Sequence, residues 1–251
     1  YPDNGTQPNV LLRNADASMY SAKEGGRNRY QFYSEDMTAR AIERLSLEHD
    51  LRGAAQRSEI FMVYQPQIEL ATNRIIGAEV LMRWRHPTQG LIAPARFIPI
   101  AEDSGLILVI GEWILVEACR QAQQWRDRGL LDASVSVNVS AIQFRQNDFV
   151  RVVERAINVS GISPDRLELE LTESVVMQGI DSTEQKLQEL DALGVKVAID
   201  DFGTGYSSLS YLRQFTVDRL KIDESFVRDL PGNIDAEAIA TAIVAMGLSL
   251  G

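Results

Sequence analysis

The sequence contains a single cysteine, Cys119, and only two histidines, His49 and His86, among its 251 residues. One cysteine cannot form a disulfide within the chain, and such sparing use of cysteine is typical of a cytoplasmic protein. Neither histidine has a recognisable pairing with a serine or cysteine, which argues against a hydrolase that works through a covalent intermediate. Any chemistry must therefore come from other side chains.

Long apolar runs and an excess of positive charge are also missing. The stretches 106–116 and 238–251 fall short of the roughly 18 to 20 apolar residues that cross a bilayer, and no signal-peptide pattern is present. We therefore expect a cytoplasmic chain with no membrane segment of its own, although upstream segments could tether a longer parent protein. The net charge of −10 argues against binding to polymeric nucleic acid. An acidic protein can still bind a phosphate ester where a bound cation reverses the local charge.

Strand-like and helix-like segments alternate along most of the chain. The predicted strands are 28–33, 60–65, 75–84, 134–140, 166–173, 196–201 and 218–223. The predicted helices are 11–23, 35–56, 94–102, 107–126, 148–160, 182–193, one near 207–215, and 235–250. From residue 59 onward the β-α-β order predicts an α/β fold with a parallel sheet, of the (β/α) barrel type. A closed barrel of eight strands would need two more than the six found there, so we expect the last two to be missing.

Polar residues share one face of several predicted strands near their carboxyl ends. Side chains alternate between faces along a strand, so residues two apart point the same way. The carboxyl ends of the strands form the active-site face of a β/α barrel, which would bring these side chains together. They are Ser136 and Asn138, Glu168 and Glu170, and Arg219, Lys221 and Asp223, and the adjacent Asp200 and Asp201 end the strand at 196–201.

Two interpretations of this acidic cluster remain open. Lys221 and Arg219 could neutralise the carboxylates in a buried salt-bridge network, which is the plainer account of any single pair. Several carboxylates meeting at one place instead favour a divalent cation, because packed carboxylates raise one another's pKa unless a cation joins them. Mg²⁺ or Mn²⁺ suits carboxylate and amide ligands, and two ions about 3.5 to 4 Å apart can hydrolyse a phosphodiester.

A glycine-rich stretch follows the two aspartates directly. Gly203 and Gly205 permit tight turning and close approach of a ligand, and Ser207 and Ser208 can cap the next helix. Because the amino terminus of a helix favours an anion, the position predicts a loop next to a phosphate.

At these residues the chain resembles the EAL domains of bacterial cyclic-di-GMP phosphodiesterases. The matching stretches, in the family's order, are Tyr-Gln-Pro (64–66), Glu-Val-Leu-Met-Arg-Trp (79–84), Phe-Ile-Pro-Ile-Ala-Glu (97–102), Asn-Val-Ser (138–140), Glu-Leu-Thr-Glu-Ser (170–174), Asp-Asp-Phe-Gly-Thr-Gly-Tyr-Ser-Ser (200–208) and Leu-Lys-Ile-Asp (220–223). Valine replaces the alanine of the naming triplet, whereas its glutamate, Glu79, is present. The resemblance implies a modified, TIM-like barrel whose first strand is antiparallel to the rest. It also implies hydrolysis of cyclic di-GMP to linear pGpG by water that two Mg²⁺ or Mn²⁺ ions activate.

The resemblance also implies a role for each matching residue. The implied metal ligands are Glu79, Asn138, Glu170, Asp200 and Asp201, the last of these to the second ion. Lys221 would orient the attacking water and, with Glu79 and Asp201, makes up the catalytic set. Contacts to the dinucleotide are implied for Gln65, Leu81, Arg83 and Asp223. Support of the loop after strand 196–201 is implied for Glu173, Phe202, Gly203, Thr204, Gly205 and Ser207.

Residues 1–34 resemble the C-terminal end of a GGDEF, or diguanylate cyclase, domain through the stretches 11–23 and 26–30. The cyclase signature itself is absent, so we expect this chain not to make the nucleotide. We therefore expect a GGDEF fragment at 1–34, a linking helix at 35–57 and an EAL domain at 58–251, from a tandem signalling protein.

One departure from the family pattern leaves the activity open. The family continues with a seventh strand that carries a further glutamate and an eighth that carries a glutamine, and both would follow Gly251. An open seam of this kind exposes strand edges to pairing with another chain, and a homodimer near 202–215 would be typical of the family. The alternatives to an enzyme are a receptor that binds cyclic di-GMP, an inactive fragment, and a barrel that acts on another phosphoester. The retained ligand set favours an enzyme.

Overall fold

A sheet of seven strands lies at the centre of the computed structural model, which describes residues 2–24, 28–130, 133–204 and 215–250. The strands are β1 (Ile60–Glu69), β2 (Arg74–His86), β3 (Gly90–Ile92), β4 (Ser134–Asn138), β5 (Leu167–Thr172), β6 (Lys196–Phe202) and β7 (Arg219–Ile222). Their order is β1-β2-β4-β5-β6-β7, with the short β3 paired to β2. β1 runs antiparallel to β2, whereas β2, β4, β5, β6 and β7 are parallel. The predicted fold class is confirmed, including the antiparallel first strand.

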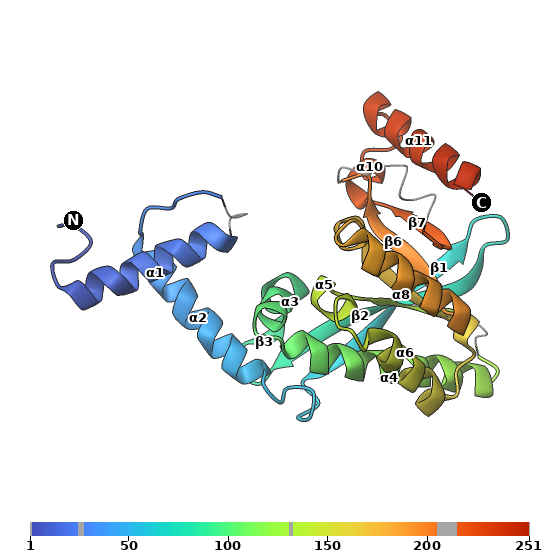
Figure 1. Cartoon of the computed structure of the whole chain (residues 1–251), viewed down its shortest axis with the longest axis horizontal. Coiled ribbons are helices and arrows are strands. Elements are labelled where there is room, and N and C mark those ends of the chain that lie inside the picture. The colour runs from blue at the N-terminus through green and yellow to red at the C-terminus, as the bar shows by residue number, and fades with distance from the viewer. Residues whose placement is uncertain (1, 25–27, 131–132, 205–214, 251) are drawn as a thin grey trace.

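Helices cover the outer face of this sheet (Figure 1). In the barrel part they are α3 (Pro94–Asp103), α4 (Leu106–Asp127), α5 (Ala141–Phe144), α6 (Phe149–Ser160), the 3₁₀ turn η1 (Pro164–Arg166), α7 (Glu173–Val176), α8 (Ile180–Leu193), α10 (Glu224–Val227) and α11 (Ile234–Leu250). The outward side chains of β4, β5 and β6 are valine, leucine and isoleucine, all buried in one core with the inner faces of α4, α6 and α8. This burial removes apolar surface from water and fixes which face of each strand turns inward.

The first two helices extend to one side of the barrel part (Figure 1). They are α1 (Pro8–Glu24) and α2 (Glu35–Leu51). The end of α2 is held by the buried side chains of Leu47 and Leu51, and Arg44 forms an ion pair with Asp103 of α3 at 2.6 Å. The helix predicted over 35–56 is present but ends at Leu51, where the extended backbone of Arg52 begins a turn.

The prediction of a strand at residues 28–33 is wrong. Residues 28–34 form no strand, and residues 28–33 line a groove together with α1 rather than pairing with a strand. A strand needs a hydrogen-bonded neighbour to satisfy its backbone, and sequence alternation alone cannot supply one. The short elements β3, α5, α7 and α10 had no clear sequence signal, because each has only three or four residues. The helix predicted near 207–215 falls largely outside the described residues.

No helix in the described part of the chain is both long enough and apolar enough to cross a membrane.

Candidate functional site

Five polar side chains, one from each of five strands, meet at the carboxyl ends of the parallel sheet. We name them the strand-end cluster: Glu79 of β2, Asn138 of β4, Glu170 of β5, Asp200 of β6 and Lys221 of β7. The parallel register explains the meeting, because side chains that follow apolar residues on neighbouring strands reach the same edge of the sheet. The sequence predicted this gathering.

The ammonium group of Lys221 contacts three carboxylates of the strand-end cluster. Its Nζ lies 2.5 Å from Oε2 of Glu170, 3.0 Å from Oδ2 of Asp200 and 3.3 Å from Oε2 of Glu79. Burial opposes the charged form of Lys221, but the hydrogen bond to Glu170 and the charges of Glu170 and Asp200 outweigh it and raise the pKa of the lysine. Lys221 therefore stays protonated and offsets part of the negative charge.

Glu170 is the most buried member of the cluster, with only 1% of the residue exposed. Burial raises its pKa to about 7, against the opposing effect of Lys221. One of its oxygens accepts the bond from Lys221, whereas the other, Oε1, is buried and has no hydrogen-bond partner in the described structure. A buried carboxylate oxygen without a partner is costly, so it points to a ligand as its partner.

Asn138 and Glu79 are joined directly, since Nδ2 of the amide donates to Oε1 of the carboxylate over 2.9 Å. No three histidine, cysteine, aspartate or glutamate side chains in the described residues are arranged as a ready metal-holding group. The donor set nevertheless fits a hard divalent cation, because it combines carboxylates, an amide and the free Oε1 of Glu170.

Asp201 lies beside this cluster on a strained backbone. Its φ angle is +55°, a left-handed value that residues other than glycine seldom adopt. Desolvation, and then the charges of Asp200 and Asp223, raise the pKa of its carboxyl. Asp223 itself accepts hydrogen bonds from the hydroxyl of Ser225 and, over 2.9 Å, from its backbone N–H, and both lower the pKa of Asp223. Strain and crowded acidic groups at one point are features of a functional site.

The start of the following loop is fixed by Glu173 of α7. This glutamate is buried, and its Oε2 accepts a hydrogen bond from the backbone N–H of Gly203 over 3.1 Å. Gly203 has a φ of +99°, and a Cβ there would lie 3.0 Å from Phe226 and 3.1 Å from Ile243. Phe202 is buried, and the hydroxyl of Thr204 donates to the carbonyl of Asp201. Gly205 and Ser207, predicted to support the same loop, lie outside the described residues.

The predicted substrate contacts on β1 and β2 share one face with Glu79. Gln65 pairs with Glu79 across the two strands, and Leu81 and Arg83 follow Glu79 at intervals of two residues. Gln65 is exposed, and Leu81 and Arg83 are partly exposed, so all three are open to a ligand. Arg83 donates within its own strand, to the carbonyl of Met82.

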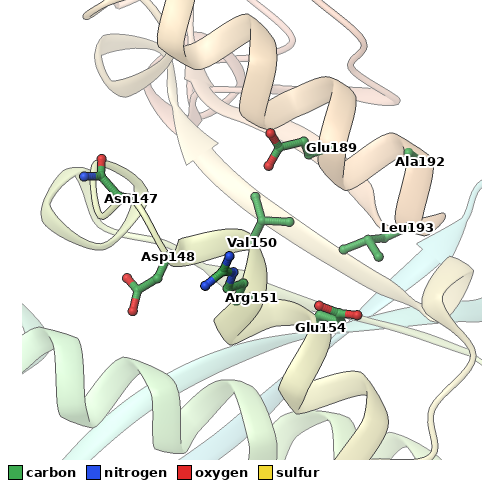
Figure 2. A pocket seen from close by; sticks show the side chains of 8 residues that line it. All are labelled: Asn147, Asp148, Val150, Arg151, Glu154, Glu189, Ala192 and Leu193. Atoms are coloured by element: carbon green, nitrogen blue, oxygen red, sulfur yellow. The ribbon is translucent and has the colours of Figure 1, made fainter.

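A separate pocket of about 670 Å³ lies between α6 and α8 (Figure 2). None of the predicted site residues line it. Glu189 of α8 faces Val150 and Arg151 of α6 across it (Figure 2). It is therefore distinct from the strand-end cluster.

Gln67 is a polar residue inside the sheet that the sequence interpretation missed. Its amide donates to the hydroxyl of Ser136 over 3.1 Å. The available signal was alternation, because Gln67 shares a face with Gln65, but Pro66 between them obscured the pattern.

The fold and the strand-end cluster together define a barrel-type α/β domain with an acidic site at the carboxyl ends of its strands. The EAL domain family matches residues 48–251, and the chain belongs to that family. The match begins ten residues before the boundary of 58 predicted from the sequence.

Two curated relatives from Pseudomonas aeruginosa align with the whole chain. One, named bifunctional diguanylate cyclase/cyclic di-GMP phosphodiesterase MucR, is 46% identical over 250 residues, which cover 100% of this chain and 36% of the relative. The other, cyclic di-GMP phosphodiesterase NbdA, is 42% identical over 250 residues, which cover 100% of this chain and 32% of the relative. The chain thus spans about a third of the length of these relatives.

A solved structure described as the PaMucR phosphodiesterase in complex with c-di-GMP is similar to this chain. The TM-score is 0.79 at 46% identity, with 82% of this chain and 83% of that chain covered.

Proposed function

We propose that this domain hydrolyses cyclic di-GMP to linear pGpG with the help of two Mg²⁺ or Mn²⁺ ions. The observation that carries the proposal is the free, buried Oε1 of Glu170 within a cluster that also holds Glu79, Asn138 and Asp200. The names of two relatives and the c-di-GMP complex of the MucR structure support the choice of substrate.

In this proposal the metal ligands are Glu79, Asn138, Glu170 and Asp200 for one ion and Asp201 for the second. Bound at this place, the ions would supply a water of lowered pKa and a positive charge for the leaving oxygen. Lys221, already protonated beside three carboxylates, would hold that water and offset the charge that develops on the phosphate.

The other predicted residues would hold and orient the substrate. Gln65, Leu81 and Arg83 lie on the face that continues from Glu79 and would contact the dinucleotide, as would Asp223. Glu173 would keep the loop at Gly203 in place and thereby position Asp201.

The upstream organisation is a further part of the proposal. We infer that residues 1–34 are the end of a GGDEF domain and that α2 links it to the EAL domain. The relative named as a bifunctional cyclase and phosphodiesterase supports this, because it aligns over 250 residues of the chain. A cytoplasmic location and a homodimer near 202–215 stay predictions.

Incubation with cyclic di-GMP and Mn²⁺, followed by chromatography of the products, tests the activity. We expect pGpG from the unsubstituted chain and none from Glu79→Ala. Glu69→Ala is a matched control, since Glu69 is an exposed glutamate on the neighbouring strand β1. Equal turnover by Glu79→Ala and the unsubstituted chain would reject the metal assignment.

Ca²⁺ separates hydrolysis from binding. We expect cyclic di-GMP to bind in Ca²⁺ without being cut, because the larger and looser shell of Ca²⁺ positions water poorly. Full activity in Ca²⁺ would contradict the two-ion mechanism. Binding in Mn²⁺ with no turnover at all would instead support the receptor alternative.

A further inference from the structure

A second layer of polar side chains lies inside the sheet, two residues before the strand-end cluster on β4, β5 and β7. We name it the lower ring: Gln67 of β1, Ser136 of β4, Glu168 of β5 and Arg219 of β7. Its hydrogen bonds form a closed circuit. Gln67 Nε2 donates to Ser136 Oγ (3.1 Å), and Ser136 Oγ donates to Glu168 Oε1 (2.7 Å). Arg219 Nη1 donates both to Glu168 Oε1 (3.2 Å) and to Gln67 Oε1 (3.4 Å). The ring therefore joins strands that are not neighbours in the sheet.

Two small residues leave room for the side chains that cross the interior. Gly77 of β2 lies between β1 and β4 in register, and a Cβ there would come within 2.4 Å of the Gln67 amide oxygen. Ala198 of β6 pairs in register with Arg219, and so lies between β7 and β5. A larger side chain at either position would block the path across the ring.

Charge distinguishes the lower ring from an ordinary polar contact. Glu168 is 1% exposed and Ser136 is fully buried, so the carboxylate has lost its water. Arg219, whose side chain is 37% exposed, is the cation that pairs with it. A buried carboxylate without such a partner carries a large penalty and attracts the nearest cation.

Two lysines are alternative cations for Glu168. Lys196 of β6 pairs in register with Glu168 but is exposed at the start of its strand, and Lys221 lies two residues after Arg219 on the same face of β7. Two residues of strand span about 6.6 Å, which the flexible stem of lysine can partly bridge. Among the described residues, the ion pairs of Lys221 are with Glu79, Glu170 and Asp200 of the strand-end cluster, and that of Arg219 is with Glu168. The two cations are thus divided between the two layers.

We propose that Arg219 and Glu168 are positioning residues, whose pairing keeps the ammonium of Lys221 among Glu79, Glu170 and Asp200. The inference rests on the proposed function, in which Lys221 holds the attacking water. Without Arg219, the unpaired Glu168 draws Lys221 away from the strand-end cluster. Without Glu168, the unpaired guanidinium of Arg219 competes with Lys221 for Glu170. With both charges removed, neither competition exists, so Lys221 returns to its place.

A double-mutant cycle tests this with Arg219→Met, Glu168→Gln and the double variant, each assayed for turnover and for cyclic-di-GMP binding in Ca²⁺. We expect each single change to lower kcat about tenfold, and the double variant to recover to within about threefold of the unsubstituted chain. The dissociation constant in Ca²⁺ should stay within about twofold throughout, because the dinucleotide contacts lie elsewhere. A pair that only stabilises the fold predicts single variants with a lower free energy of unfolding but a kcat within about twofold of the unsubstituted chain while they are folded, and that result would overturn the proposal.

The exposed pair Arg120 and Glu117 on α4 provides the matched control. Arg120→Met, Glu117→Gln and their combination make the same chemical changes away from the site. They should leave kcat unchanged. A tenfold loss there would show that such substitutions lower activity without regard to position, and would remove the support.

Crystal structures separate a failure of this inference from a failure of the proposed function. In Arg219→Met we expect Nζ of Lys221 within hydrogen-bond distance of Glu168, whether or not the unsubstituted chain is active. A Lys221 that still contacts Glu79, Glu170 and Asp200 in that variant would overturn the inference alone.

Ser136→Ala keeps the test decisive if Arg219→Met does not fold. It preserves every charge but removes the hydroxyl that donates to Glu168. We expect kcat to fall by about threefold or more, with unchanged binding in Ca²⁺, because Glu168 then depends more on a cation. An unchanged kcat in Ser136→Ala would overturn the proposal.

Discussion

The two faces of strands β4, β5 and β6 contain opposite kinds of side chain, although both are buried up to the strand ends, where Asn138 is exposed and Asp200 is partly exposed. The outward face carries Val135, Val137, Leu167, Leu169, Leu171, Val197 and Ile199. The inward face carries Ser136, Asn138, Glu168, Glu170, Ala198 and Asp200. Leu169 is 0% exposed and its neighbour Glu170 is 1% exposed, so burial alone does not distinguish the faces.

The two faces differ in how the free-energy cost of removing their side chains from water is offset. The outward residues gain free energy when they leave water, and they need only close packing with α4, α6 and α8. The inward residues lose hydration and therefore need partners, which Lys221 and Arg219 provide for Glu170 and Glu168. The outward face therefore stabilises the fold, whereas the inward face holds charge in a fixed arrangement at some cost.

Replacement of Lys221 should have the largest effect on activity. Lys221→Met removes the cation that contacts three carboxylates, and we expect kcat to fall by about a hundredfold to a thousandfold. Steady-state turnover of cyclic di-GMP in Mn²⁺ measures it. Arg128→Met is the control and should be near normal, because Arg128 is an exposed residue at the end of α4. A loss of less than threefold would remove Lys221 from the catalytic set.

Shortening an apolar side chain on the outward face should lower the free energy of unfolding. Leu169→Ala leaves a cavity in the core, and we expect it to lower the free energy of unfolding by about 2–5 kcal/mol, as measured by urea denaturation. Leu70→Ala is the control, because Leu70 is 97% exposed. If Leu169→Ala lowered kcat at full stability instead, the division of roles between the two faces would be wrong.

Proton competition at Glu170 should give a smaller and graded effect. Its pKa is raised to about 7, so below that pH the carboxyl carries a proton that a metal ligand must release. We expect Mn²⁺ affinity to fall by about tenfold for each pH unit below 7, and to level off above about pH 8. Calorimetric titration between pH 5.5 and 8.5 measures this. Constant affinity across that range would contradict the assignment of Glu170 as a ligand.

An exposed ion pair should give the smallest effect. Arg120 and Glu117 keep 46% and 33% of their side chains exposed, so water and salt screen their attraction. We expect Arg120→Met to change the free energy of unfolding by less than about 1 kcal/mol. A larger loss of stability would contradict the distinction between exposed ion pairs and the buried ion pairs of the inward face.

Of the two accounts of the acidic residues that the sequence left open, the structure contains the first, and the divalent-cation account stays a prediction. The salt-bridge network exists, since Lys221 contacts Glu170 and Asp200 and Arg219 contacts Glu168. The free Oε1 of Glu170 shows that the network does not satisfy every buried oxygen. The lower layer is therefore a closed ring of charge and hydrogen bonds, whereas the upper layer keeps a buried acceptor, Oε1 of Glu170, without a hydrogen-bond partner among the described residues.

Local pattern accounts for the predictions that succeeded and for the one that failed. Apolar alternation on β4 and β5 identified the inward face. Side chains alternate between the two faces of a strand, so once the apolar residues are placed outward the polar residues must point inward. The segment 28–33 alternates in the same way but has no strand beside it, so its pattern misled. The short helices α5, α7 and α10 give too few residues for any helical period to be recognised.

The sequence by itself determined which residues line each strand, which face is polar and which family the motifs resemble, because these depend on order and spacing along the chain. Tertiary structure alone decided that Lys221 contacts three carboxylates and that Arg219 pairs with Glu168. It also decided that one oxygen of Glu170 has no hydrogen-bond partner among the described residues. The physical reason is that the partners of these charges come from strands up to 142 positions apart, and only the register and stagger of the sheet set which atoms come within reach.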